Sequence, residues 1–211
     1  MTGLRLSPDD AYFIMRGLRT LDTRLNRHYE NTKHIMWSVS KSFTNAVVGL
    51  AVKDGKLSTD QSICEFYPEF RHTQKCDVTI DHLLRYTAGF DWTEKYEPST
   101  LKDILQLKRS DVFQMNSGIG NKDTANYVLS KSLKYEPGST LQYNTGTPNA
   151  LMGILKRIYG DSYNEFIQNR LFKKIGDLNY FWQKDGSGTN LGGSHLFTTP
   201  RTMLSFGEMY L

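Results

Sequence analysis

The sequence has little cysteine and little proline, with 2 and 6 residues of these types in a chain of 211. Cys64 and Cys76 form no Cys-x-x-Cys pair and accompany no histidine at zinc-ligand spacing. This pattern argues against a disulfide scaffold and against a zinc site, so we expect no bound metal. The few prolines, together with an aromatic content of 12%, argue against a disordered chain.

A long apolar run and a strong net charge are also missing. The longest apolar run, residues 46–52, is far shorter than the roughly 20 residues that span a membrane. Residues 1–5 lack the hydrophobic region of a signal peptide. The net charge is +4 and the basic residues are scattered, which argues against nucleic acid as a partner. We therefore expect a cytoplasmic protein that binds neither a membrane nor a nucleic acid.

Apolar residues in this sequence mostly recur at helical spacing. Few segments show the alternation of apolar and polar residues that is typical of a strand. Ser7 and Pro8 suit the start of a capped helix over residues 7–27. Further helices are expected over residues 38–52, 99–107, 124–131, 147–159, 162–172 and 200–210, with Ser162 as the cap of the helix at 162–172. Shorter features are an element capped by Ser58 or Thr59, an extended piece that enters a helix within residues 78–84, and a turn at residues 136–138. The predicted fold class is α+β with helix predominant.

A Ser-x-x-Lys pattern occurs twice, at Ser38–Lys41 and at Ser99–Lys102. Lys41 is followed by apolar residues at helical spacing, which predicts a buried helix, whereas Lys102 has polar neighbours. Residues i and i+3 share a helix face, so the amine of Lys41 can reach the hydroxyl of Ser38. A buried neutral lysine can act as a base, and amides at a helix start can stabilise an oxyanion. The alternative is that Ser38 only caps a helix and Lys41 extends to solvent.

Tyr143, Asn144 and Thr145 form a second candidate group after the turn at 136–138. A tyrosine beside a lysine ammonium ionises more readily and can relay a proton. Asn144 and Thr145 can donate hydrogen bonds to a substrate. The alternative is that Tyr143 only packs within a loop. His195, which follows two glycines, is expected to be a structural or surface histidine rather than a base.

Several motifs occur in a fixed order along residues 35–211. They are Trp37-Ser38-Val39-Ser40-Lys41-Ser42-Phe43, Gly55-Lys56-Leu57, Thr79-Ile80-Asp81-His82-Leu83-Leu84, Thr87-Ala88-Gly89, Glu136-Pro137-Gly138, Tyr143-Asn144-Thr145-Gly146, and Gly192-Gly193 with Leu196-Phe197. In this order they resemble the class C β-lactamase-related serine hydrolases, a group that includes penicillin-binding-protein-like peptidases, β-lactamase-type esterases and 6-aminohexanoate-dimer hydrolases.

The resemblance implies Ser38 as the nucleophile, Lys41 as its activating partner and Tyr143 as the second proton-transfer residue. Thr145 stands where this group commonly has Asn or Ser. The implied fold is β-lactamase/transpeptidase-like but lacks much of its antiparallel sheet. In this family a Lys-Thr-Gly or His-x-Gly strand, which supplies the second oxyanion donor, follows the helix that ends this sequence. We therefore expect a truncated chain.

Residues 1–34 resemble another family. Thr2-Gly3-Leu4-Arg5-Leu6-Ser7-Pro8-Asp9-Asp10-Ala11-Tyr12 and Arg16-Gly17-Leu18-Arg19-Thr20-Leu21 are similar to a helix of the cystathionine β-lyases, which use pyridoxal phosphate. The cofactor-binding lysine of that family lies upstream of this helix, so no Schiff-base site is carried over and no cofactor is expected. Two units are predicted, a lyase-like helical segment at 1–34 and a hydrolase fragment at 35–211 with a helical subdomain at about 57–175.

Three functions stay open at this point. The leading one is a serine hydrolase that cleaves a small-molecule ester or amide through an acyl-enzyme, with Ser38, Lys41 and Tyr143 catalytic and Asn144 and Thr145 contacting substrate. The second is an inactive chimeric or truncated fragment that forms homo-oligomers through apolar surface that further strands would cover. The third is a fragment of a pyridoxal-phosphate-dependent cystathionine lyase.

Overall fold

The computed structural model of the chain describes residues 32–211 except 97–100, 102–104, 106–109 and 118. The α-helices are α3 (Ser40–Lys53), α4 (Ile63–Phe66), α5 (Ile80–Leu84), α7 (Asp111–Ser117), α8 (Thr124–Ser130), α9 (Gly146–Tyr159), α10 (Tyr163–Ile167) and α11 (Pro200–Glu208). Five 3-10 turns are η1 (Trp37–Val39), η2 (Pro68–Phe70), η3 (Gln74–Asp77), η4 (Ile119–Lys122) and η5 (Gly160–Ser162), and η6 (Gln168–Phe172) is a π-helical turn. The strands β1 (His34–Ile35), β2 (Phe181–Trp182) and β3 (Leu196–Thr198) form one antiparallel sheet in the order β1-β3-β2. Helix predominates over strand in the described residues, as predicted.

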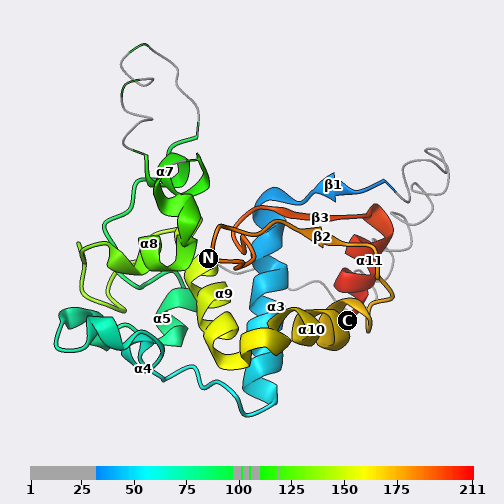
Figure 1. The fold of residues 1–211 in the computed structure, drawn as a ribbon, viewed down its shortest axis with the longest axis horizontal. Helices are drawn as coiled ribbons and strands as arrows, with labels where there is room; N and C mark the ends of the chain where they lie inside the picture. The colour runs from blue at the N-terminus through cyan, green and yellow to red at the C-terminus, as the bar shows by residue number, and fades with distance from the viewer. Residues whose placement is uncertain (1–31, 97–100, 102–104, 106–109, 118) are drawn as a thin grey trace.

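Helix α3 runs through the middle of the molecule, with the sheet and α11 on one side and α5, α8 and α9 on the other (Figure 1). Its apolar residues recur at helical spacing, and Phe43, Val47 and Ala51 are fully buried. The ring of Phe43 stacks on that of Phe206 in α11, with 3.8 Å between ring centroids. Helix α3 therefore packs in the core on both of its sides, and the packing on both sides holds its first turn in place.

Helices α8 and α9 pack closely against each other because α9 has a glycine at the contact. A Cβ added to Gly153 would lie 2.2 Å from the Cβ of Ala125 in α8 and 2.6 Å from the hydroxyl of Tyr67. Any larger residue would push the two helices apart. This contact orients α9, whose first turn reaches the candidate site.

The helices predicted at 124–131, 147–159 and 200–210 are confirmed by α8, α9 and α11. The helix predicted at 38–52 is confirmed as α3, but it begins at Ser40, so Ser38 lies in the preceding turn η1. The helix predicted at 162–172 continues as the π-helical turn η6 after Ile167, and Ser162 makes no side-chain cap. The helix expected at 7–27, and most of the one expected at 99–107, lie outside the described residues.

The short element expected to be capped by Ser58 or Thr59 begins later instead. Helix α4 is capped by Ser62, whose hydroxyl accepts from the amide of Cys64, while the side chain of Glu65 accepts from the amide of Ser62. This reciprocal capping box satisfies two amides at once, which explains why the helix starts at this serine. The helix predicted within 78–84 is confirmed as α5, with Thr79 as its cap. The predicted turn at 136–138 is also confirmed, since the Ser139 amide donates to the Glu136 carbonyl.

Cys64 and Cys76 form a disulfide, with 5.2 Å between their Cα atoms. The sequence argued against a disulfide scaffold and did not predict this single bond. Cys-x-x-Cys spacing is informative for metal and redox sites, but a pair separated by 12 residues meets only because α4 and η3 lie side by side. Disulfides are rare in cytosolic proteins, so this bond removes one basis of the expected cytoplasmic location.

The sheet joins the start of the described chain to its end. His34 and Ile35 of β1 pair with Thr198 and Phe197 of β3. Just beyond β1, the amide of Met36 donates to the carbonyl of Leu196 at 2.8 Å. The amide of Leu196 in turn donates to the hydroxyl of Ser40 at 3.2 Å. These bonds fix the turn that carries Ser38 against the first residue of β3.

Candidate active site

Ser38 and Lys41 lie on consecutive turns at the start of α3. The Nζ atom of Lys41 donates to Oγ of Ser38 at 3.1 Å, the contact expected from their spacing of three residues. Ser38 is exposed, whereas Lys41 is only 9% exposed. The turn η1, which contains Ser38, begins with Trp37. This residue has a positive φ of 44°, which is uncommon for a residue other than glycine. The site thus combines an accessible hydroxyl with a buried amine.

Lys41 has three oxygen partners, as many as an ammonium has hydrogens. Besides Ser38, its Nζ donates to the carbonyl oxygen of Gly193 at 2.6 Å and to Oγ1 of Thr145 at 3.3 Å. Nζ also lies 5.1 Å from the centroid of the Tyr143 ring, a cation–π distance. The alternative that Lys41 extends to solvent is therefore wrong: it points into the protein and contacts three separate segments of the chain.

Tyr143 is 48% exposed and lies beside Lys41 through its ring. In the described part of the chain, its hydroxyl makes no hydrogen bond to Ser38 or Lys41. Its ring packs on that of Tyr86 with 5.2 Å between centroids, and the amide of Gln142 donates to the carbonyl of Tyr86 at 2.8 Å. Burial raises the pKa of Tyr86 well above its usual value, and the nearby groups of Tyr143 and Glu94 raise it further. Tyr86 therefore remains a neutral phenol against which Tyr143 packs.

Asn144 and Thr145 are both buried beside Tyr143. The side-chain amide of Asn144 donates to the carbonyl of Gln142 at 2.9 Å, and its oxygen accepts from the amide of Thr147 at 2.8 Å. Asn144 thereby fixes the first turn of α9. Thr145 contacts Lys41 through its hydroxyl. That these two residues contact a substrate stays a prediction.

Sequence reasoning missed Glu94, which contacts Thr145 from the opposite side to Lys41. Its carboxylate accepts from the amide of Thr145 at 3.0 Å and from its hydroxyl at 2.5 Å. It also accepts from Nε1 of Trp92 at 2.5 Å and from the hydroxyl of Tyr96. A single glutamate in a polar loop has no distinctive spacing, so the sequence held no signal for it.

Gly193 and Asn149 were also missed as parts of the site. The amide of Gly193 donates to Oδ1 of the buried Asn149 at 2.9 Å, and the carbonyl of the same glycine accepts from Lys41. The neighbouring carbonyl of Gly192 accepts from the hydroxyl of Thr44 at 2.9 Å. The two glycines belong to a motif that carried the family resemblance, but their contact with Lys41 depends on the fold.

A cavity of about 290 Å³ opens at Ser38. It is lined by Trp37, Ser38, Tyr96, Val112, Asn116, Thr145, Ser194 and His195. Oδ1 of Asn116 is buried there and has no hydrogen-bond partner among the described residues, so it is an acceptor that a bound molecule could use. The lining thus combines aromatic surface with a few polar atoms, as small-molecule sites do.

His195 lies in the cavity lining, half-buried, with its Nδ1 atom 2.5 Å from Oγ of Ser194. Its ring packs edge-on against that of Trp37. Burial lowers the pKa of His195 below its usual value, which favours the neutral ring at neutral pH. Its place beside the cavity was not expected from the sequence.

Within the described ranges, no group of three or more His, Cys, Asp or Glu side chains is arranged to hold a metal ion. None of the described helices combines the length and apolar character that crossing a membrane requires.

The arrangement of helices around a small antiparallel sheet is a β-lactamase/transpeptidase-like fold. The putative 6-aminohexanoate-dimer hydrolase from Bacillus anthracis has this fold and superposes with a TM-score of 0.69 over 88% of this chain and 49% of that chain, at 22% identity. The Beta-lactamase family description matches residues 11–209. The chain belongs to the Beta-lactamase family.

Similarity extends over nearly the whole chain in one curated relative. The 6-aminohexanoate-dimer hydrolase of Paenarthrobacter ureafaciens is 24% identical over 206 residues, which are 96% of this chain and 52% of that protein. The chain therefore spans about half the length of this relative.

The likeness to a pyridoxal-phosphate lyase is short. The L-methionine gamma-lyase of Fusobacterium nucleatum subsp. polymorphum is 44% identical over 41 residues, only 10% of that enzyme's length. The Beta-lactamase match begins at residue 11, inside the segment predicted to be lyase-like. Nothing beyond such short likenesses supports a lyase function.

Proposed function

We propose that the chain carries the nucleophile of a serine hydrolase that cleaves a small-molecule ester or amide through an acyl-enzyme. The observation that supports this best is the 3.1 Å contact between Nζ of Lys41 and Oγ of Ser38 at the mouth of a cavity. A nucleophile within hydrogen-bond reach of a base, which other groups hold in place, is the usual geometry of covalent catalysis. Membership of the Beta-lactamase family supports the same reaction class.

In the proposed reaction Oγ of Ser38 bonds to the carbonyl carbon while its proton passes to the neutral amine of Lys41. The contacts of Lys41 with Gly193, Thr145 and the Tyr143 ring stabilise the ammonium formed. The amide of Ser38 is proposed to donate to the developing oxyanion. The bond between the carbonyl carbon and the leaving oxygen or nitrogen then breaks, and the proton passes to the leaving alcohol or amine, with Tyr143 as the second transfer residue. The acyl group remains on Oγ of Ser38 as an ester. Water hydrolyses the ester to release the acid and restore Ser38.

The test is covalent labelling with a fluorophosphonate probe, which forms an oxygen–phosphorus bond to an activated serine and releases fluoride. We expect the wild-type chain to gain one probe, mapped to Ser38 by peptide mass spectrometry, and Ser38→Ala to gain none. Ser42→Ala is the matched control because Ser42 is an exposed serine on the same helix, and it should react like the wild type. Equal labelling of the wild type and Ser38→Ala, or no labelling of the wild type, would contradict the assignment.

A further inference from the structure

We infer that Glu94 is a positioning residue that holds Thr145 so that its hydroxyl oxygen accepts from Lys41, and this inference rests on the proposed function. Glu94 itself touches neither Ser38 nor Lys41 in the described contacts. It acts through Thr145, which lies between the glutamate and the lysine. Its effect on the site is therefore one of orientation.

The contacts of Thr145 favour one arrangement of its hydroxyl. A threonine hydroxyl has one hydrogen to donate and two lone pairs. The short 2.5 Å contact with the carboxylate of Glu94 directs the hydrogen toward Glu94, because an ionised carboxylate only accepts. One lone pair is then available to Nζ of Lys41 at 3.3 Å, and the hydroxyl of Tyr96 lies 2.7 Å from the same oxygen. Without Glu94, the hydroxyl could turn and donate elsewhere, and Lys41 would lose one of its three acceptors.

The backbone of Thr145 is held by the same carboxylate. Its amide donates to the second oxygen of Glu94 at 3.0 Å. The two carboxylate oxygens therefore bind both the amide and the hydroxyl of Thr145. Thr145 is 1% exposed, and water cannot replace these bonds without opening the core. The hydroxyl of Tyr96 lies 2.7 Å from Oγ1 of Thr145 and also contacts the carboxylate of Glu94, so its one hydrogen is shared between these two acceptors. Tyr96 lines the cavity and covers Thr145 on that side.

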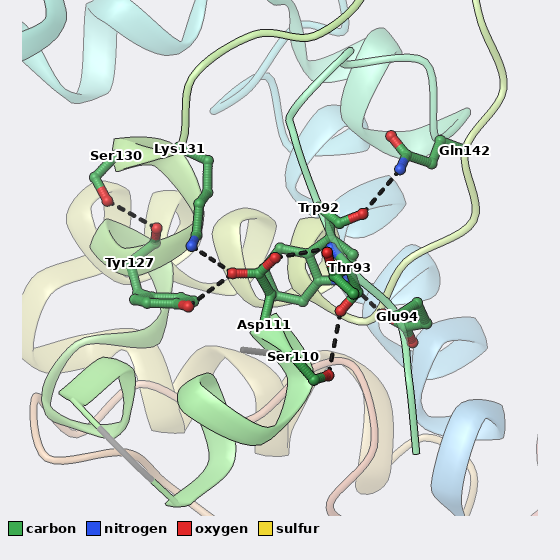
Figure 2. A network of polar contacts seen from close by, with 9 residues as sticks. All are labelled: Trp92, Thr93, Glu94, Ser110, Asp111, Tyr127, Ser130, Lys131 and Gln142. Carbon is green, nitrogen blue, oxygen red and sulfur yellow. Dashed lines mark hydrogen bonds and ion pairs between the residues drawn. The ribbon is translucent and has the colours of Figure 1, made fainter. Parts of the chain in front are cut away.

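The segment that carries Glu94 is itself anchored (Figure 2). The amide of Thr93 donates to the buried carboxylate of Asp111 at 2.7 Å, and Asp111 also accepts from the hydroxyl of Tyr127 at 2.8 Å and pairs with Lys131. On the other side, the side-chain amide of Gln142 donates to the carbonyl of Trp92 at 3.0 Å. The two residues before Glu94 are thus fixed by α7, α8 and the segment before Tyr143, so the carboxylate is placed before any substrate arrives.

The first measurement detects the contact between Glu94 and Thr145 directly and does not depend on activity. In NMR spectra recorded at one fixed pH, the amide proton of Thr145 should move upfield in Glu94→Gln, because a side-chain amide oxygen is a weaker acceptor than a carboxylate oxygen. The control Glu69→Gln should leave this resonance at its wild-type position, since Glu69 sits in an exposed pair with Arg157. A Thr145 amide resonance that does not move in Glu94→Gln would overturn the inference.

The second measurement detects the effect of this contact on Ser38, as the rate at which the fluorophosphonate labels that serine. Glu94→Gln is expected to label about 10- to 100-fold more slowly than the wild type and Glu69→Gln at the wild-type rate. Thr145→Val should show the same loss, Thr145→Ser a smaller one, and the double variant Glu94→Gln/Thr145→Val no further loss. This non-additivity is required if Glu94 acts through Thr145. If the two substitutions caused independent structural defects, their fold-losses in labelling rate would multiply.

The outcomes separate the two hypotheses. Wild-type labelling at Ser38 with an unchanged rate in Glu94→Gln would overturn the positioning role and leave the proposed function intact. If the wild type is not labelled at all, the proposed function is wrong, and the amide shift of Thr145 decides the Glu94–Thr145 contact on its own. Should Glu94→Gln fail to fold, Thr145→Val and Thr145→Ser carry the rate comparison.

Discussion

At Gly193 the backbone itself contacts the lysine of the candidate site. The carbonyl oxygen of Gly193 accepts from Lys41 and its amide donates to Asn149. A Cβ added here would lie 2.4 Å from the carbonyl oxygen of Thr145 and 2.6 Å from its Cγ2. Both are far below the distance of normal contacts, and one of the two atoms is backbone that cannot easily move. Only glycine lets this carbonyl reach Lys41.

We predict that Gly193→Ala lowers the free energy of unfolding by about 1–3 kcal/mol, the usual effect of overpacking, and slows labelling of Ser38 by displacing an acceptor of Lys41. Gly49→Ala is the matched control, because no atom lies within 4 Å of the added Cβ and the residue is exposed within α3. It should raise the free energy of unfolding by about 0.5–1 kcal/mol. Urea denaturation followed by tryptophan fluorescence measures both, and equal midpoints for the two variants would contradict the packing argument.

At the scale of elements, the disulfide joins α4 to η3 within the helical half of the molecule. Cys64 is buried, and the bond closes a short loop of the chain. Neither element is long enough to be stable alone, since α4 and η3 each comprise four residues. The bond therefore keeps two weak elements together by restricting the unfolded chain.

We predict that Cys64→Ala/Cys76→Ala, or reduction of the wild type, lowers the free energy of unfolding by about 2–4 kcal/mol. Urea denaturation with and without a reducing agent measures the difference, and the double variant should be insensitive to the reductant. Thiol titration of the unreduced, denatured wild type should detect no free thiol. Two reactive thiols per chain would show that the bond is absent.

Elements with local signals could be predicted from the sequence, and those that depend on distant partners could not. The cap at Thr79 and the end of α3 at Asp54-Gly55 are determined by residues adjacent in the sequence. Strands β1 and β2, of two residues each, are too short to show an alternating pattern. They exist only because β3 lies between them.

At the scale of the whole molecule the same distinction applies to the site. The contact of Ser38 with Lys41 follows from helical spacing, so it could be predicted. The closeness of Tyr143 to Lys41 was implied by family resemblance alone. Glu94, Asn149 and the carbonyl of Gly193 reach the site from distant segments, and no local pattern marks them.

The pairing of β1 with β3 has a consequence for how the protein folds. Lys41 and Gly193 are 152 residues apart in sequence, and Ser40 and Leu196 are 156 apart. Bringing such distant segments together costs loop-closure entropy that no local helix has to overcome. Long-range contacts of this kind form slowly, while single helices form within about a microsecond. We therefore expect Ser38 to become reactive only when both ends of the described chain have come together.

We predict that refolding from urea restores the helical circular dichroism signal before it restores labelling. Timed additions of the fluorophosphonate probe during refolding measure the second process, and its rate should match the slowest change in tryptophan fluorescence. Labelling that returns together with the first helical signal would contradict this order. If Ser38 is the nucleophile, its labelling would report on folding, because the distant ends of the described chain must join before the site is complete.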